Sequence, residues 1–270
     1  MNWRAIRAVV RKDLTVVLRS KMIMGTIVGV SLAMLIVLPL GVGLMGLFIP
    51  EATSSDIEEL MAMMPPPLLE RFEGYTPTEL WFEYAIVYMF APMFLIVPLM
   101  VSSVIAADSF VGERERKTME ALLHTPITNW ELLIAKMLSA WLAAMAVSIV
   151  GFLLYAAIAN ISGVQVLGRV FFPPVMWLLL VFWVSPATAA VGLGVSVLVS
   201  TRVSTFQEAY QASSVVVLPV VALMFGQVMG VMYFSEVLTL ILGLVIWAIA
   251  GVILWFGVKT FEREKLIARL

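Results

Sequence analysis

The 270-residue chain has no cysteine, one histidine and few charged residues. Without cysteine it forms no disulfide bond, holds no thiolate-bound metal and uses no cysteine nucleophile. The absence of cysteine does not indicate whether the protein resides in an oxidising or a reducing compartment. Only 13% of the residues are charged, whereas soluble globular domains carry about 25%. The formal net charge is −1 and no basic patch dominates, so the sequence does not indicate nucleic-acid binding.

Long apolar runs take up most of the chain, and 62% of its residues are hydrophobic. A helix needs about 20 apolar residues to cross a bilayer. The runs are too long and too numerous for buried helices of a soluble protein, and they lack a polar face. We therefore predict an all-α integral membrane protein. It forms a single transmembrane domain over residues 1–270, with spans at roughly 23–49, 84–107, 132–159, 171–199, 209–233 and 237–258.

Lysine and arginine predict the orientation, because they concentrate on the cytoplasmic side of membrane proteins. With the N-terminus inside, six spans place all 17 basic residues except Arg71 and Arg169 on the cytoplasmic side. The opposite orientation would leave only these two inside. The sequence therefore predicts that both termini are cytoplasmic.

Residues 1–21 are too polar to span the bilayer but follow a helical pattern. Apolar side chains recur at steps of three and four residues, at Trp3, Ile6, Val10, Leu14 and Val17. A separate stripe of arginines consists of Arg4, Arg7 and Arg11. The pattern predicts an amphipathic helix at the inner membrane surface. A basic retention tail is the alternative.

The predicted outer loop, residues 50–83, is acidic, with Arg71 as its only basic residue. Its carboxylates either gather cations at an outer mouth or form a solvated surface, and no Asp-x-Asp-x-Asp-Gly calcium loop is present. The stretch Thr76–Glu79 is a capping box with proline at the first helical position, which predicts the start of a helix.

The predicted spans contain essentially no ionisable residue deep in the membrane. A proton- or sodium-coupled carrier normally uses a buried carboxylate, so the sequence disfavours that class. It also disfavours an intramembrane enzyme. The only histidine, His124, lies in a predicted cytoplasmic segment, and no His-Glu-x-x-His zinc motif occurs.

Gly112 and the pair Lys117-Thr118 look like part of a phosphate-binding loop, which requires Gly-x-x-x-x-Gly-Lys-[Ser/Thr]. The second glycine is missing here, and Glu113 and Glu115 would repel phosphate. We therefore expect this chain to have no nucleotide site and to bind no metal or other cofactor of its own.

A charged block, GERERKTMEALLHTP at residues 112–126, interrupts the apolar runs within the segment 108–131. Opposite charges four residues apart favour a helix here: Glu113 with Lys117, and Arg116 with Glu120. A capping box at Thr128–Glu131 then starts the third span. From the residues alone, the charged helix is either a solvated connector or a docking site for a soluble partner.

The segment ADSFVGERERKTMEALLHTPITNWELLIAK, residues 107–136, resembles the stretch between the second and third spans of type-2 ATP-binding-cassette (ABC) transporter permeases. In that family, a Gly-Glu-[Arg/Lys/Glu]-Glu block is followed by a threonine, a Leu-Leu pair, Thr-Pro and a final lysine. The matching residues are Gly112, Glu113, Glu115, Thr118, Leu122, Leu123, Thr125, Pro126, Ile127 and Lys136. The N-terminal helix, the six spans and the absence of an ATPase motif agree with the family's architecture.

The resemblance implies a permease subunit of an ATP-driven exporter in the cell membrane of a prokaryote. Two permease copies, or one copy and a paralogue, would bind two copies of a separate cytoplasmic ATPase that holds ATP and Mg. The helix between the second and third spans would be the coupling helix, seated in a groove of the ATPase. The residues expected to contact the ATPase or couple to it are Glu113, Arg114, Glu115, Arg116, Lys117, Glu120 and His124. Arg202, in the second cytoplasmic turn at 200–208, is a lesser contact.

The family pattern also implies that the first, second and fifth spans line the pathway at the interface between the two permease copies. The pathway candidates are Phe90, Phe94, Gln211, Ser213 and Ser214. Ordinary helix packing is the alternative for the two phenylalanines. Two other functions stay open: an ion-coupled secondary carrier or channel, and a membrane scaffold that relays ATPase motion to an extracytoplasmic partner.

Overall fold

The computed structural model describes residues 2–48, 61–62, 64, 66–118, 127–229 and 232–260. Within these ranges every regular element is a helix, and six helical stretches are long and apolar enough to cross a membrane. They cover Lys21–Leu44, Pro77–Glu115, Trp130–Val166, Val175–Ser200, Phe206–Gln227 and Glu236–Gly257. The predicted all-helical architecture with six candidate spans is therefore confirmed.

Several spans are composite. The first consists of α2 (Lys21–Leu32), the π-helical turn η1 (Ala33–Val37) and α3 (Leu38–Phe48). The second consists of α6 (Pro77–Tyr84), η2 (Ala85–Met89), α7 (Ala91–Phe94), α8 (Ile96–Ala107), η3 (Asp108–Gly112) and α9 (Glu113–Glu115). The third is α11 (Asn129–Val166), and the fourth consists of α12 (Val175–Leu179), η4 (Leu180–Val184) and α13 (Ser185–Ser200). The fifth consists of α14 (Phe206–Ser214), the 3₁₀ turn η5 (Val215–Val217) and α15 (Leu218–Val228), and the sixth is α16 (Glu236–Thr260). Outside the spans lie α1 (Trp3–Arg19) and α5 (Pro66–Arg71).

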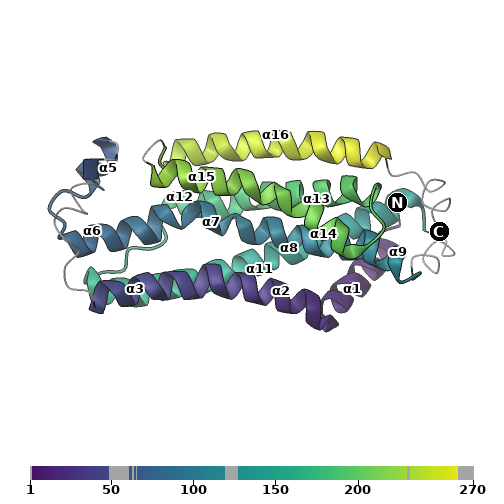
Figure 1. Cartoon of the computed structure of the whole chain (residues 1–270), viewed down its shortest axis with the longest axis horizontal. Coiled ribbons are helices and arrows are strands. Elements are labelled where there is room, and N and C mark those ends of the chain that lie inside the picture. Colours follow the sequence, from purple (N-terminus) through teal and green to yellow (C-terminus); the bar gives the residue numbers. More distant parts are fainter. Residues whose placement is uncertain are drawn as a thin grey trace.

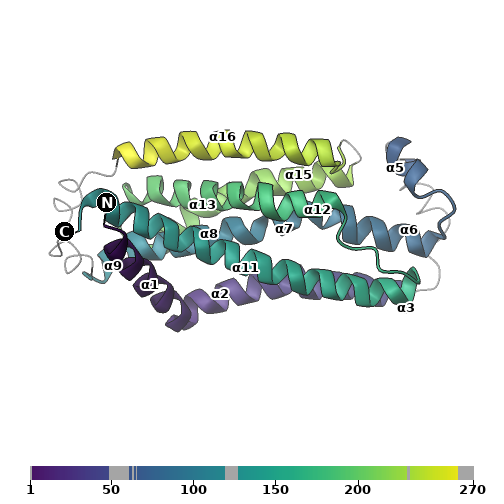
Figure 2. The same cartoon turned by 180° about the vertical axis from the view of Figure 1, so that it is seen from behind.

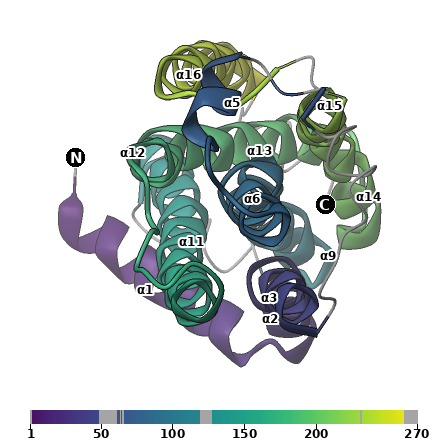
Figure 3. The same cartoon turned by 90° about the vertical axis from the view of Figure 1, so that its left-hand side faces the viewer.

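The spans run side by side along one axis, with α5 and α6 at one end and α1 and α9 at the other (Figure 1). Seen along this axis, the second span lies at the centre, and α16 and α15 lie at the periphery (Figure 3). The most apolar stretch of the second span is 83% buried, against 17% for both the fifth and the sixth. The last two spans therefore leave a large apolar surface for lipid or a partner.

Helix starts follow local sequence signals. Thr76, Thr128 and Thr205 each accept a hydrogen bond from the backbone N–H three residues later, and the glutamate at that position bonds back to the cap. These capping boxes satisfy donors that a helix start leaves unpaired. The boxes predicted at Thr76 and Thr128 are therefore confirmed.

The π-helical turn η2 interrupts the central span but leaves its carbonyls satisfied. Tyr155 on α11 donates its hydroxyl to the carbonyl of Ile86 at 2.6 Å, and the Trp177 indole on α12 donates to that of Val87 at 2.8 Å. An unpaired carbonyl at membrane depth would cost several kcal/mol. The two aromatic side chains thus allow an irregular helix in the bundle interior.

The two basic residues that break the orientation rule, Arg71 and Arg169, converge on one buried carboxylate. Glu83 on α6 pairs with Arg71 at 3.4 Å and with Arg169 at 3.2 Å. The hydroxyl of Tyr75 also donates to Glu83, at 3.0 Å. Burial, together with the charge of Glu83, raises the pKa of this tyrosine above its ordinary value. This outer clamp (Arg71, Tyr75, Glu83 and Arg169) joins α5, α6 and the connection from α11 to α12.

Close packing of α8 against α13 depends on Gly192. A Cβ atom at this position would lie 2.5 Å from the carbonyl oxygen of Leu99 and 2.6 Å from the hydroxyl of Ser102. A Cβ atom added to Gly251 on α16 would have no neighbouring atom within 4 Å among the described residues. Of the two positions, therefore, only Gly192 lacks room for a side chain, because the backbone of α8 lies too close.

This difference predicts opposite effects of the same substitution. We expect Gly192→Ala to lower the thermal unfolding midpoint, because forcing an extra methyl into a packed interface costs about 1–3 kcal/mol. Gly251→Ala should leave the midpoint unchanged or raise it, since alanine is the better helix former. Tryptophan fluorescence of the purified variants during heating measures both. Equal midpoints would show that α8 and α13 do not pack this closely.

Candidate coupling junction

The described start of the charged block lies at the end of the bundle where α1, the start of α11 and the start of α14 meet (Figures 1 and 2). The structure describes its first residues, 112–118. Glu120 and His124, which were also expected to contact the ATPase, lie outside the described residues.

Glu113 is buried rather than exposed. Its side chain is 6% accessible and pairs with the fully buried ammonium of Lys136 on α11 at 2.5 Å. Its other oxygen accepts a hydrogen bond from Lys12 on α1. Lys136 also donates to the carbonyl of Ser109, at 2.6 Å. Glu113 therefore joins α9 to both α1 and α11.

The helical pair predicted between Glu113 and Lys117 is wrong. Helix α9 ends at Glu115, and Lys117 adopts a left-handed backbone with φ of 56°. The four-residue spacing brings two side chains together only within a continuous helix. Glu113 instead pairs with lysines that are distant in the sequence.

Helix α1 contacts α11 through both apolar and polar groups. Ile6 and Val9 pack in one cluster with Leu132 and Ala135 of α11. The backbone N–H of Asn2 donates to a carboxylate oxygen of Glu131 at 2.5 Å. The predicted N-terminal helix is present, and the structure shows what its apolar stripe covers: another helix of the same chain.

Two charges of α1 point into the same junction. Burial alone would lower the pKa of Lys12, but the hydrogen bond and charge of Glu113 outweigh it and raise this pKa above its ordinary value. Asp13 is buried, lies 3.3 Å from the Lys12 ammonium and accepts from the hydroxyl of Ser139 at 3.2 Å. The junction therefore balances two lysines, Lys12 and Lys136, against two carboxylates, Asp13 and Glu113.

A second set of contacts joins the block to the turn before α14. The Arg114 guanidinium donates to the carbonyl of Val203. A carboxylate oxygen of Glu115 accepts from the backbone N–H of Phe206, the first residue of α14, at 2.8 Å. Arg116 pairs with Asp108 at 2.9 Å. Arg114 and Glu115 thus contact the turn before α14 and its first residue, while Arg116 pairs within the second span itself.

Lys117 and Arg202 are exposed at this end. They belong to different turns, and those turns are joined by the contacts of Arg114 and Glu115. Of the predicted coupling residues that the structure describes, Glu113 is therefore enclosed, while Lys117 and Arg202 are free to meet another molecule.

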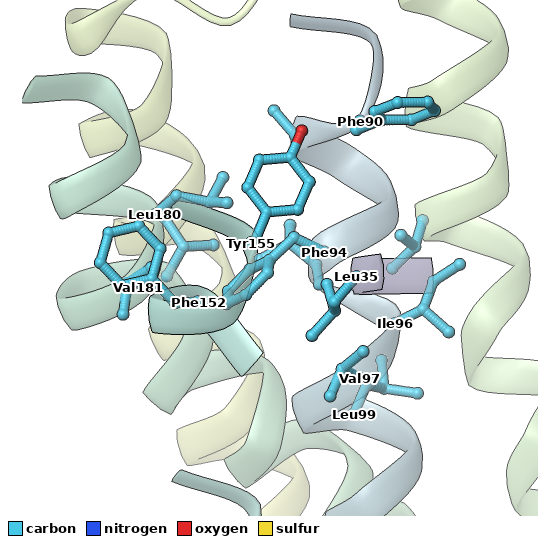
Figure 4. Packing of buried hydrophobic residues seen from close by; sticks show 14 of the residues in the cluster. Leu35, Phe90, Phe94, Ile96, Val97, Leu99, Phe152, Tyr155, Leu180 and Val181 are labelled. Carbon is cyan, nitrogen blue, oxygen red and sulfur yellow. The ribbon is translucent and has the colours of Figure 1, made fainter. Parts of the chain in front are cut away.

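The five pathway candidates do not form one group. Phe90 and Phe94 are buried, and Figure 4 shows Phe94 inside the packed core near Phe152 and Tyr155. The Phe94 ring lies edge-on to Trp177 with the ring centres 5.5 Å apart. Ser213 is buried and its hydroxyl bonds that of Ser196 at 3.0 Å. The two remaining candidates, Gln211 and Ser214, are exposed on α14.

The importance of Lys12 and Asp13 was missed at the sequence level. A signal for Asp13 was present, because it follows Ile6 by seven residues and precedes Val17 by four, on the buried stripe of α1. A charge on such a stripe needs a buried partner. The neighbouring sequence does not reveal which residue that partner is.

A family model described as "ABC-2 family transporter protein" matches residues 7–240. No curated protein matches this chain. Permeases of this family usually lack ATPase activity, which resides in a partner subunit. The match covers the first five candidate spans, the first residues of the sixth, and the charged junction. The chain therefore belongs to the ABC-2 family and is the membrane component of an ABC transporter.

Proposed function

We propose that this chain is the permease of an ATP-driven exporter and that the block at 112–126 couples it to a cytoplasmic ATPase. One observation carries the proposal: the charged residues 113–116 together contact α1, α11, the start of α14 and the end of the second span. Glu113 binds α1 and α11, Arg114 and Glu115 bind the turn and first residue of α14, and Arg116 binds η3. A displacement of this block would act on several helices at once.

The mechanism follows from where the contacts lead. The block follows directly from the central second span, and the ion pairs of Glu113 reach Lys136, near the cytoplasmic start of the third span, and Lys12, in the middle of α1. ATP binding and hydrolysis in the partner would push on the exposed turn around Lys117. The rigid ionic contacts would carry this movement into the spans, which would switch between two packings.

The peripheral spans support pairing with a second permease copy or a paralogue. The first span is 28% buried over its most apolar stretch and the fifth only 17%. Exposed polar side chains on α14, Gln211 and Ser214, would be costly against lipid. A second copy placed against the first and fifth spans would cover their exposed surface, whereas the expected contribution of the second span is limited by its 83% burial within this chain. Both termini then lie in the cytoplasm of a prokaryotic cell.

The test is capture of a candidate ABC ATPase from the same organism by the tagged permease. Lys117→Glu should abolish capture without changing the unfolding midpoint, because this side chain is exposed and forms no ion pair among the described residues. Lys21→Glu, another exposed lysine at this end, is the matched control and should retain the ATPase.

Captured complexes in lipid nanodiscs should then hydrolyse ATP at a rate that responds to the permease. If the folded wild-type permease captures no ATPase, the proposal is wrong, and an ion-coupled carrier becomes the better hypothesis. If Lys117→Glu and Lys21→Glu behave alike, the block does not form the docking surface.

A further inference from the structure

The packing of α1 on α11 determines which side of α1 faces outward. Ile6, Val9, Asp13 and Val17 are buried on one side of the helix. On the opposite side, Arg4, Arg7 and Arg11 are exposed in the part of the chain that the structure describes.

That outward side carries a positive stripe without compensating acids. Arg4, Arg7 and Arg11 are exposed at spacings of three and four residues, which places them on one helix face. The only acid of α1, Asp13, points inward. The ion pairs found among the described residues at this end engage Lys12, Arg116 and Lys136, and none engages the three arginines.

Large apolar side chains flank the stripe. Trp3 is 57% exposed, Leu18 is 69% exposed and Met22, at the start of α2, is 67% exposed. Helix α1 runs obliquely along the outside of the bundle and leads through Ser20 into the first span (Figures 1 and 3). The C-terminal end of α1 therefore lies directly beside the start of the first span.

We propose that the outward face of α1, formed by Arg4, Arg7 and Arg11 between Trp3 and Leu18, binds the phosphate groups of anionic phospholipids. Guanidinium groups pair well with phosphate, and exposed tryptophan and leucine insert beside the headgroups. Lipid is favoured over a soluble partner because α1 leads directly into the first span, which places the exposed Leu18 and Met22 beside the bilayer. The inference stands apart from the proposed function, because it concerns the permease alone.

The absence of cysteine allows a direct test. Ala8 is exposed between Arg7 and Arg11, so Ala8→Cys introduces a single thiol for an environment-sensitive fluorophore. The purified permease, without any ATPase, is titrated in detergent with short-chain phosphatidylglycerol, with short-chain phosphatidylcholine and with inorganic phosphate. We expect saturable binding of phosphatidylglycerol only, weakened by salt.

The variant Arg4→Gln/Arg7→Gln/Arg11→Gln should raise the half-saturating phosphatidylglycerol concentration on the order of 100-fold, at about fivefold for each arginine. A matched control removes three other exposed cations at this end that lie away from α1: Lys117→Gln/Arg202→Gln/Lys259→Gln. The control should bind like the parent. Equal responses to the two lipids, or equal losses in the two triple variants, would overturn the proposal. It is also overturned if only the ATPase changes the fluorescence, because α1 then contacts protein.

Discussion

Replacement of Glu113 by alanine is expected to destabilise the folded permease by about 3–5 kcal/mol, the cost of removing one partner of a buried ion pair. The substitution leaves the ammonium of Lys136 fully buried and without a counter-charge, with the carbonyl of Ser109 and the Phe110 ring, centred 5.7 Å away, as its remaining partners. Lys12 is half-exposed and can turn to water, so Lys136 carries most of the effect. Thermal unfolding of the purified variant, followed by tryptophan fluorescence, measures the loss.

The double variant Glu113→Ala/Lys136→Met separates stability from coupling. Removing both buried charges should recover most of the lost stability, because an apolar side chain can replace a buried ion pair at little cost. We expect the recovered protein to bind the ATPase but not to alter its ATP turnover, since the link between α9 and α11 is missing. A double variant as unstable as Glu113→Ala would show that Lys136 is not the source of the cost. Normal coupling would show that the ion pair transmits nothing.

Loss of both arginines of the outer clamp is expected to have the second-largest effect. Glu83 is 2% accessible, whereas the side chains of Arg71 and Arg169 are 47% and 55% accessible. Arg71→Met/Arg169→Met leaves a buried carboxylate with the Tyr75 hydroxyl as its remaining side-chain partner, at a cost of about 3–5 kcal/mol. Glu83→Gln should cost much less, because the two arginines can then turn to water.

The triple variant Arg71→Met/Arg169→Met/Glu83→Gln supplies the control. It should be more stable than the double variant, because it removes the unpaired charge and keeps a side chain of the same shape. Hydrogen exchange in α5 should rise in the double variant if the clamp holds this helix in place. A triple variant no more stable than the double variant would contradict the assignment of the cost to Glu83.

Local signals in the sequence were sufficient to predict the membrane-spanning helices and the starts of two of them. Six apolar runs predicted six candidate spans, and the boxes at Thr76 and Thr128 predicted where two helices begin. The motif at 107–136 was sufficient to identify the family, which the match over 7–240 confirms. These features depend on hydrophobicity over about 20 residues or on hydrogen bonds across three residues, so neighbouring residues determine them.

Other features depended on which helices pack together. The acidic loop expected at 50–83 includes a helix, α6, that begins at Pro77 and continues into the central span, where Glu83 is buried. Arg71 and Arg169 looked like two unrelated exceptions to the orientation rule until one carboxylate brought them together. No local pattern links residues that are 86 positions apart.

Glu113 shows the same limit at the candidate site. Its spacing to Lys117 suggested a pair along a helix, but the helix ends at Glu115. Its actual partners are Lys12 and Lys136, which lie 101 and 23 residues away. The sequence by itself determined that this block is charged and lies between two spans. Only the tertiary structure decided which charges are enclosed and which are exposed, because the cost of burying a charge depends on the partners that distant helices bring to it.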